Sequence, residues 1–254
     1  MISLAGKAAL VTGGSRGIGA ATVKMFAQAG ADVVFSYHQR GDLAKQVEQE
    51  ARKHGTRIES YKADAGRMAS AKKLIQFAHE RLGRLDILVA NAGIWNNEGI
   101  PIEKLTERDW DEMVRVNLKG VYTVVREAVP HMIAQRTGRI IAVASVAGQR
   151  GTPLHSHYSA TKGGVISFVK ALSAELARYN ILVNCVAPGF VDTDMWKLTA
   201  KDKSKMREWL AAYPLNRMAR PEEVAGPILF AASDLATFIT GEVINVNGGS
   251  FRCG

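Results

Sequence analysis

The feature that most constrains the fold is a regular alternation between short β-branched runs and longer stretches with helical periodicity. The short runs predict strands, and they are apolar almost throughout, as in strands that are buried on both faces. They are Ala8–Thr12, Asp32–Ser36, Arg57–Lys62, Ile87–Ala90, Arg139–Ala144, Leu182–Val186 and Val243–Val246. The intervening periodicity predicts helices over Gly17–Ala29, Asp42–His54, Met68–Leu82, Glu107–Gln135, His157–Arg178 and Glu222–Ser233.

Repetition of strand, helix and strand favours right-handed crossovers and a parallel sheet covered on both faces. We therefore predict an α/β fold, a doubly wound parallel sheet of the Rossmann type with about seven strands. No linker rich in Pro, Gly or Ser divides the 254 residues, so residues 1–254 are predicted to form one domain. Ligands of such sheets bind beyond the carboxyl ends of the strands, so the residues there are candidates for chemistry.

Composition and charge narrow the classes of function. The 33 Lys and Arg residues exceed the 24 Asp and Glu residues, which gives a net charge of +9. This excess suits phosphorylated cofactors, acidic partners, membranes or nucleic acid, but no nucleic-acid-binding signature accompanies it. No apolar stretch reaches the roughly 18 residues of a membrane span, and Met1–Lys7 does not resemble a signal peptide. With Cys185 and Cys253 as the two cysteines, we expect a cytoplasmic protein that binds neither nucleic acid nor membrane.

A glycine-rich turn follows the first predicted strand and leads directly into the first predicted helix. Glycines let the backbone approach a pyrophosphate closely, and the helix N-terminus offers unpaired N–H groups to the phosphates. The turn is not a P-loop, because no Gly-Lys-Ser/Thr follows it. It predicts a dinucleotide site with contacts from Gly13, Ser15, Arg16 and Ile18.

The end of the second strand indicates which dinucleotide binds. A carboxylate there would bond the adenosine ribose and repel a 2′-phosphate, but Tyr37 and its neighbours include none. Arg16, His38 and Arg40 can instead approach one phosphate, and arginine makes paired, charge-assisted hydrogen bonds. The alternative is that both arginines are solvated surface charges. We favour NADP(H) as the cofactor.

Two further strand ends fit the same ligand. Asp64 and Ala65 follow the third strand, where the carboxylate could accept a hydrogen bond from the adenine amino group. Asn91 and Gly93 follow the fourth strand, where small residues would let the backbone run beside the cofactor. Each segment on its own is also compatible with simple turn chemistry.

Tyr158 and Lys162 are four residues apart on a predicted helix, so their side chains share one face. A neighbouring ammonium is predicted to lower the pKa of the phenol, which is normally near 10, towards the range useful for proton transfer. Ser145 ends the fifth strand, where its hydroxyl could polarise a carbonyl group of the substrate. This set predicts hydride transfer to a carbonyl, with Tyr158 as the proton donor.

The order of these motifs resembles the short-chain dehydrogenase/reductase family across essentially the whole chain. The matching segments are Thr12–Gly19, Asn91–Gly93, Asn117, Ser145, Tyr158, Lys162 and Pro188–Gly189. The resemblance implies an NADP-dependent oxidoreductase acting on CH–OH or C=O groups, and a homotetramer joined through the long helices and the C-terminal strand. It implies four catalytic residues, in which the Asn117 side chain helps hold a water that relays protons to Lys162. It also implies that Lys162 contacts the nicotinamide ribose and that Pro188, Gly189, Val191 and Thr193 surround the nicotinamide.

Two segments, Pro188–Met195 and Gly241–Gly249, resemble the 3-oxoacyl-[acyl carrier protein] reductases of this family. The implied substrate is a 3-oxoacyl thioester of acyl carrier protein or coenzyme A, as in fatty acid biosynthesis. In these relatives surface arginines near the active-site mouth dock the acidic carrier. Arg136 occupies one such position, and Arg178 stands one residue before the other.

The substrate pocket is expected to involve Trp95, His155 and Trp196. The segment Lys197–Arg207 carries five basic residues and one acidic residue, and it predicts a cationic lid over an anionic substrate or, alternatively, a solvated helix face. His155 and His157 are poorly spaced for a metal, and no metal is expected. Two alternatives stay open: a dehydrogenase of a free sugar, steroid, small alcohol or ketone, and a catalytically silent NADP(H)-binding sensor or scaffold.

Overall fold

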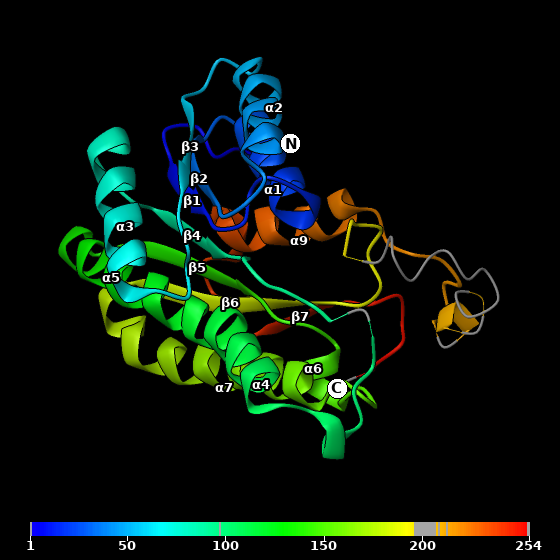
Figure 1. The fold of residues 1–254 in the computed structure, drawn as a ribbon. Coiled ribbons are helices and arrows are strands. Elements are labelled where there is room, and N and C mark those ends of the chain that lie inside the picture. The colour runs from blue at the N-terminus through cyan, green and yellow to red at the C-terminus, as the bar shows by residue number, and fades with distance from the viewer. Residues whose placement is uncertain (1, 97, 196–206, 208, 212, 253–254) are drawn as a thin grey trace.

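The computed structural model describes residues 2–96, 98–195, 207, 209–211 and 213–252. These residues contain one seven-stranded parallel sheet with the strand order β3-β2-β1-β4-β5-β6-β7 (Figure 1). The chain order reverses between β1 and β4, which creates the switch point where doubly wound sheets bind ligands. The strands are β1 (Ala8–Val11), β2 (Asp32–Tyr37), β3 (Ile58–Lys62), β4 (Ile87–Ala90), β5 (Gly138–Val143), β6 (Ile181–Pro188) and β7 (Val243–Val246).

Helices cover both faces of the sheet (Figure 1). One face is covered by α1 (Gly17–Gln28), α2 (Gly41–Arg52) and α9 (Pro221–Ala232). The other is covered by α3 (Met68–Leu82), α5 (Gly120–Gln135) and α7 (Ser156–Leu176). Shorter elements are α4 (Glu107–Val114), α6 (Ala147–Arg150) and the 3₁₀ turns η1 (Ile102–Lys104), η3 (Ala177–Tyr179) and η5 (Asp234–Ala236).

The strands are apolar on both faces because each face has its own core. Successive residues of a strand point to opposite sides, so Leu10 enters the core under α3, α5 and α7 while Ala9 enters the core under α1 and α9. Ile140 and Ile141 on β5 divide in the same way. The prediction of a single doubly wound sheet with both faces buried is confirmed.

One predicted helix needs correction. The stretch Glu107–Gln135 is interrupted by a π-helical turn, η2 (Arg115–Lys119), between α4 and α5. Asn117 lies in this turn with its side chain bonded to the backbone of Ile94. Such turns insert an extra residue into a helix and occur often at functional sites. The helical periodicity of the sequence could not reveal the insertion, because the helix continues on both sides of it.

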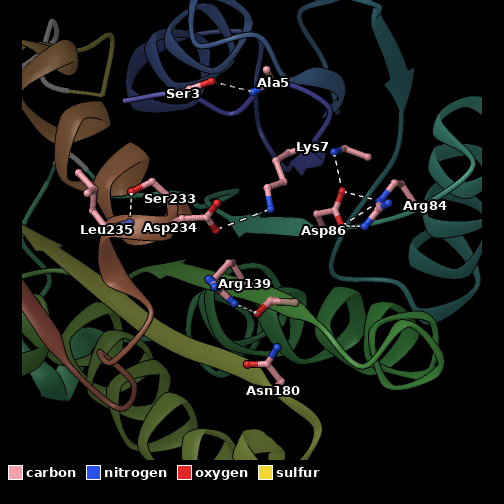
Figure 2. A network of polar contacts seen from close by, with 12 residues as sticks. Ser3, Ala5, Lys7, Arg84, Asp86, Arg139, Asn180, Ser233, Asp234 and Leu235 are labelled. Atoms are coloured by element: carbon pink, nitrogen blue, oxygen red, sulfur yellow. Dashed lines mark hydrogen bonds and ion pairs between the residues drawn. The ribbon is translucent and has the colours of Figure 1, made fainter. Parts of the chain in front are cut away.

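The amino-terminal edge of the sheet is closed by polar contacts (Figure 2). The Asp86 carboxylate accepts a hydrogen bond from the Ala8 N–H at 2.9 Å and is bound by the Arg84 guanidinium, with a closest distance of 2.7 Å. Lys7 reaches Asp234 at 3.7 Å on the same side. These contacts fix the starts of β1 and β4, and they leave the opposite, carboxyl edge for ligand binding. No described helix is both long enough and apolar enough to span a membrane.

Candidate active site

A cleft of about 1280 Å³ runs along the carboxyl edge of the sheet. Its walls come from the segments that follow β1 to β6, as the fold predicts for a parallel sheet with a switch point. Nearly all the predicted cofactor and catalytic residues line it; the exception, Asn117, sits behind the wall. The structure therefore brings these predicted residues together along one cleft.

The glycine turn forms a tight cradle at one end of the cleft. Gly13 and Gly17 have positive φ values of 68° and 54°, and a Cβ added to Gly19 would lie 2.2 Å from the Gly13 carbonyl oxygen. The turn is held by Asn91, whose Nδ2 donates to the Thr12 carbonyl at 2.9 Å and to the Gly13 carbonyl at 3.2 Å. A cradle with no room for side chains, at the N-terminus of α1, fits the pyrophosphate of a dinucleotide.

The residues expected to select the 2′-phosphate line the adenosine end of the cleft. Arg16, His38 and Arg40 are exposed there, and Tyr37 is half-buried. Arg40 is already paired with Asp42 through two hydrogen bonds of 3.0 and 2.6 Å. Arg16 has no ion-pair partner among the interactions of the described residues, so it is the arginine better placed to bind an added phosphate.

Asp64 lies in the cleft, but its carboxylate already accepts hydrogen bonds from other residues of the protein. Arg115 Nη1 donates to both of its oxygens at 2.9 and 2.8 Å, and the Gly66 N–H donates to one of them at 3.0 Å. Burial opposes ionisation of this carboxyl, and the Arg115 contact outweighs it, so the pKa of Asp64 lies below its usual value. Arg115 also binds Glu112. The predicted bond from adenine must therefore share an oxygen with Arg115. Ala65 is buried beside it.

Ser145 and Tyr158 meet at the other end of the cleft. Ser145 follows β5, Tyr158 lies in the first turn of α7, and their hydroxyls are hydrogen-bonded. The Ala147 N–H donates to Ser145 Oγ at 3.1 Å, which fixes the hydroxyl at the strand end. Two hydroxyls side by side in the cleft form a site for one carbonyl oxygen.

The prediction for the acidity of Tyr158 was wrong for the protein alone. Burial raises the pKa of the phenol to about 12, and the hydrogen bond from Ser145 lowers it only in part. Lys162 Nζ lies 5.8 Å from the centroid of the Tyr158 ring and donates instead to the Val143 carbonyl at 2.8 Å. Desolvation therefore outweighs the charge of the ammonium. The phenol is a proton donor that stays protonated at neutral pH.

Burial also shifts the pKa of Lys162. Its side chain is buried under the cleft, and desolvation lowers the pKa of the ammonium to about 8. Gly148 of α6 lies against its backbone, because a Cβ there would be 2.5 Å from the Lys162 carbonyl carbon. The lysine is thus fixed in place and poised to change its charge near neutral pH.

Asn117 is fully buried, and its side chain clamps the segment after β4. Its Oδ1 accepts from the Ile94 N–H at 2.8 Å, while Nδ2 donates to the Ile94 carbonyl at 2.9 Å and to Met113 Sδ at 3.0 Å. Both amide hydrogens are therefore committed to protein atoms. The side chain thereby fixes Gly93 and Ile94 beside Lys162. Because Oδ1 keeps a second lone pair, the role of Asn117 in holding a water stays a prediction.

The segment after β6 covers the cleft between its two ends. The Val146 N–H donates to the Pro188 carbonyl at 3.0 Å, and Val191 forms a bridge with Ala219. Thr193 reaches the glycine turn, because a Cβ on Gly17 would lie 3.0 Å from its methyl group. Gly189 is crowded by Tyr213 in the same way. The predicted wrapping segment is therefore placed over the cofactor cradle.

Two predicted substrate residues line the cleft and two do not. Trp95 and His155 stand beside Tyr158. Arg136 precedes β5 and Arg178 precedes β6, at the amino edge of the sheet, where the Asn180 side chain donates to the Arg136 carbonyl at 3.4 Å. Both arginines therefore lie away from the cleft of the same chain, with the length of β5 and β6 between, and their docking of an acidic carrier stays a prediction. Trp196 and all of the Lys197–Arg207 segment except Arg207 lie outside the described residues.

Several other residues of the cleft could not be found from the sequence pattern. Arg115 was hidden inside a helical pattern, and Phe190 follows a Pro-Gly turn. Phe190 stacks on Trp209 with ring centroids 5.7 Å apart and meets Tyr213 at 5.1 Å. No group of His, Cys, Asp and Glu among the described residues has the arrangement of a metal site.

A pyrophosphate cradle at the switch point, with a half-buried serine and a buried tyrosine and lysine at the far end of the same cleft, defines a class: oxidoreductases that use a nicotinamide dinucleotide. Comparison with known proteins then assigns the family. Residues 13–250 match the family model described as enoyl-(acyl carrier protein) reductase, and the chain belongs to the short-chain dehydrogenase/reductase family.

Individual relatives are similar over nearly their whole length. The chain is 42% identical over 251 residues to the 3-oxoacyl-[acyl-carrier-protein] reductase FabG of Thermotoga maritima, covering 97% of this chain and 98% of the relative. It is 42% identical over 252 residues to the same reductase of Aquifex aeolicus, covering 98% and 99%. The crystal structure of gox2181 superposes with a TM-score of 0.94 at 32% identity, covering 98% and 96% of the two chains.

Proposed function

We propose that this protein is an NADPH-dependent reductase that converts 3-oxoacyl thioesters to their 3-hydroxyacyl forms, with acyl carrier protein as the natural carrier. The observation that carries the reaction type is the contact between the Ser145 and Tyr158 hydroxyls at the cleft end opposite the glycine cradle. The identity of 42% to two reductases named for 3-oxoacyl-[acyl-carrier-protein] supports the substrate class.

The bound nicotinamide would supply a hydride to the carbonyl carbon, and the chain's own residues perform the other tasks. Ser145 and Tyr158 hold the carbonyl oxygen between two hydroxyl groups, which polarises the C=O bond. As the carbonyl carbon is reduced, charge develops on the oxygen, and Tyr158 donates its proton there to give the hydroxyl group. The C=O π bond is broken, and a C–H and an O–H bond are formed.

Donation of its proton leaves Tyr158 as a phenolate until it is protonated again from solvent. The Lys162 ammonium, which lies below the phenol ring, stabilises the phenolate while it exists. Asn117 holds Gly93 and Ile94 in position beside that ammonium and acts as a positioning residue. The roles of Ser145, Tyr158, Lys162 and Asn117 are therefore distinct in chemistry although they share one site.

The substrate test is NADPH oxidation with four substrates: 3-oxobutanoyl thioesters of acyl carrier protein and of CoA, the 2-enoyl thioester crotonyl-CoA, and a panel of free ketones and sugars. We expect turnover of both 3-oxo thioesters and none of crotonyl-CoA, because the two hydroxyls hold an oxygen on the carbon that is reduced, and C3 of crotonyl-CoA bears none. Turnover of free sugars alone would overturn the thioester assignment. Turnover of crotonyl-CoA alone would favour the enoyl reaction named by the family model.

A second candidate is a reductase of a free ketone, or a dehydrogenase of the matching alcohol. Its support is a solved structure from Sinorhizobium meliloti, named provisionally as a short-chain alcohol dehydrogenase, with 34% identity and a TM-score of 0.93. That alignment covers 98% of this chain and 97% of the other. The aromatic side chains around Tyr158 would also suit a free ketone.

For the cofactor, Arg16→Ala should raise the KM for NADPH about 10- to 100-fold, the loss expected for one charge-assisted bond to a phosphate. The KM for NADH should change less than about twofold, because NADH lacks that phosphate. Steady-state kinetics with both cofactors measures the effect. Arg178→Ala removes an exposed arginine at the opposite edge of the sheet and should change neither KM. Equal losses with NADPH and NADH would contradict a 2′-phosphate site at Arg16.

We further propose a cytoplasmic homotetramer. Large apolar side chains remain exposed in the single chain, such as Phe238, Leu235 and Tyr122, and β7 is an edge strand with half-exposed residues. An exposed edge strand and apolar side chains are typical of surfaces that pair with other copies. Light scattering after size-exclusion chromatography should give about four times the 27.5 kDa of one chain.

A further inference from the structure

Three aromatic rings form a compact group at the substrate end of the cleft. The Trp95 indole stacks on the His155 imidazole with ring centroids 4.0 Å apart and planes only 10° from parallel. The same indole meets the Tyr158 ring edge-on, at 4.5 Å and 90°. Trp95 follows β4, whereas His155 and Tyr158 belong to the start of α7. The pair Trp95–His155, here called the aromatic clasp, therefore joins two separate walls beside the proton donor.

The imidazole is held between two carbonyl groups. Its Nδ1 lies 3.0 Å from the Pro153 carbonyl oxygen, and its Nε2 lies 3.1 Å from the Asn96 carbonyl oxygen. One carbonyl is on each of the two walls, and a neutral ring, which has one N–H, donates to one of them at a time while facing both. The His155 ring is thereby fixed in the orientation that supports the indole.

The backbone joins the same two walls. The Ile100 N–H donates to the Leu154 carbonyl at 2.8 Å and joins the two walls. Within the second wall, the Thr152 N–H donates to Ser159 Oγ at 3.0 Å. Leu154 has a φ of 63°, in the left-handed region that non-glycine residues rarely adopt. Gly99 lies so close to it that an added Cβ would be 2.7 Å from Leu154 Cβ. Strain of this kind persists only where the surroundings impose it, and it is concentrated at ligand-binding segments.

The clasp is also backed by buried side chains. Trp95 packs in a small apolar cluster with Met113, Ala147 and Tyr158, of which Met113 is 3% exposed and Ala147 is 5% exposed. The indole is therefore supported by buried side chains on the side of this cluster. It forms a rigid wall at one side of the bound carbonyl.

We propose that the aromatic clasp sets the length of acyl chain that the enzyme accepts, and that it favours short-chain 3-oxoacyl groups. This inference rests on the proposed function. The thioester arm of the substrate must leave the cleft, because its carrier is too large to enter. The alkyl arm on the other side of the carbonyl then meets the indole, and each further methylene is crowded by it.

The test compares kcat/KM for 3-oxobutanoyl-, 3-oxohexanoyl-, 3-oxooctanoyl- and 3-oxodecanoyl-CoA in the wild type and in variants of the clasp. The wild type should prefer the four-carbon over the eight-carbon substrate at least about tenfold. Trp95→Ala should reduce or reverse this preference by about tenfold or more, and His155→Ala should do so in part because the indole loses its support. Trp110→Ala removes an indole that is 39% exposed and does not line the cleft, and it should leave the preference unchanged.

A change in the ratio of kcat/KM between short and long substrates shows that Trp95 selects chain length, whereas a purely structural role would change kcat/KM equally for all lengths. If Trp95→Ala lowers kcat/KM equally for all lengths, or if the wild type reduces the ten-carbon substrate as well as the four-carbon one, the proposal is overturned. The same series is measured with ethyl 3-oxo esters. Reduction of these esters without reduction of the thioesters would reject the proposed carrier, while the length ratio on the esters would still decide the role of the clasp.

Discussion

Tyr158→Phe should lower kcat/KM for carbonyl reduction by about 10³- to 10⁴-fold, while NADPH still binds with a dissociation constant within about twofold of the wild type. The phenyl ring preserves the edge-on contact with Trp95 and the buried surface, so only the hydroxyl is removed. That hydroxyl is the proton donor, and its pKa of about 12 keeps it protonated throughout the neutral range. Hydride transfer would then leave an alkoxide without a proton source.

The measurement is single-turnover NADPH oxidation, together with NADPH binding followed by fluorescence. Tyr122→Phe is the matched control, since Tyr122 is 42% exposed on α5 and does not line the cleft. It should retain wild-type kinetics. Unchanged turnover in Tyr158→Phe would reject the assignment of the proton donor. Absence of turnover in the wild type, with NADPH still bound, would favour the catalytically silent NADP(H)-binding protein.

The sequence predicted most of this architecture because two physical patterns are strong in it. Strands buried on both faces produce uninterrupted apolar runs, and the glycine turn must come between the first strand and the first helix. Bounds moved by only one or two residues, as when β6 extended from Leu182–Val186 to Ile181–Pro188. The placement of Tyr158 and Lys162 in one cleft followed from their helical spacing, while their roles stay predictions.

What could not be predicted depends on burial and on contacts between distant segments. The pKa of Tyr158 is raised because the phenol is desolvated, and helical spacing to Lys162 does not report desolvation. Arg115 binds Asp64 from 51 positions away in the chain, and Asn117 binds Ile94 from a π-helical turn. Arg136 seemed close to the active site through resemblance alone, but it lies at the other end of β5.

Lys162→Met should nearly abolish activity and yet stabilise the protein at neutral pH. Burial lowers the pKa of the Lys162 ammonium from 10.5 to about 8. Below pH 8 the lysine is charged in both the folded and the unfolded chain, so the folded state bears the full cost of a buried charge. At about 1.4 kcal/mol for each pH unit, this cost is about 3 kcal/mol. Methionine has a similar shape and no charge, so the substitution removes this cost of burying a charge.

The hydrogen bond to the Val143 carbonyl is lost in the variant and offsets part of the gain. We therefore expect a net stabilisation of about 1–2 kcal/mol at pH 7, which corresponds to a rise in Tm of several degrees. Between pH 8 and 10.5 the unfolded wild type binds more protons at this residue than the folded protein does, so the stability of the wild type rises with pH. The difference between wild type and variant should shrink over this window.

The Lys162 charge that lowers the stability of the folded protein should raise its activity. kcat/KM for reduction in the wild type should fall as the pH rises through about 8, because the neutral lysine no longer stabilises the phenolate. Lys162→Met should be about 10²- to 10⁴-fold less active and should lack this limb of the pH profile. Lys170→Met, an exposed lysine on the same helix, is the control and should alter neither stability nor rate. A variant that loses both activity and stability at pH 7 would show that the Val143 contact, and not the cost of the buried charge, dominates at this position.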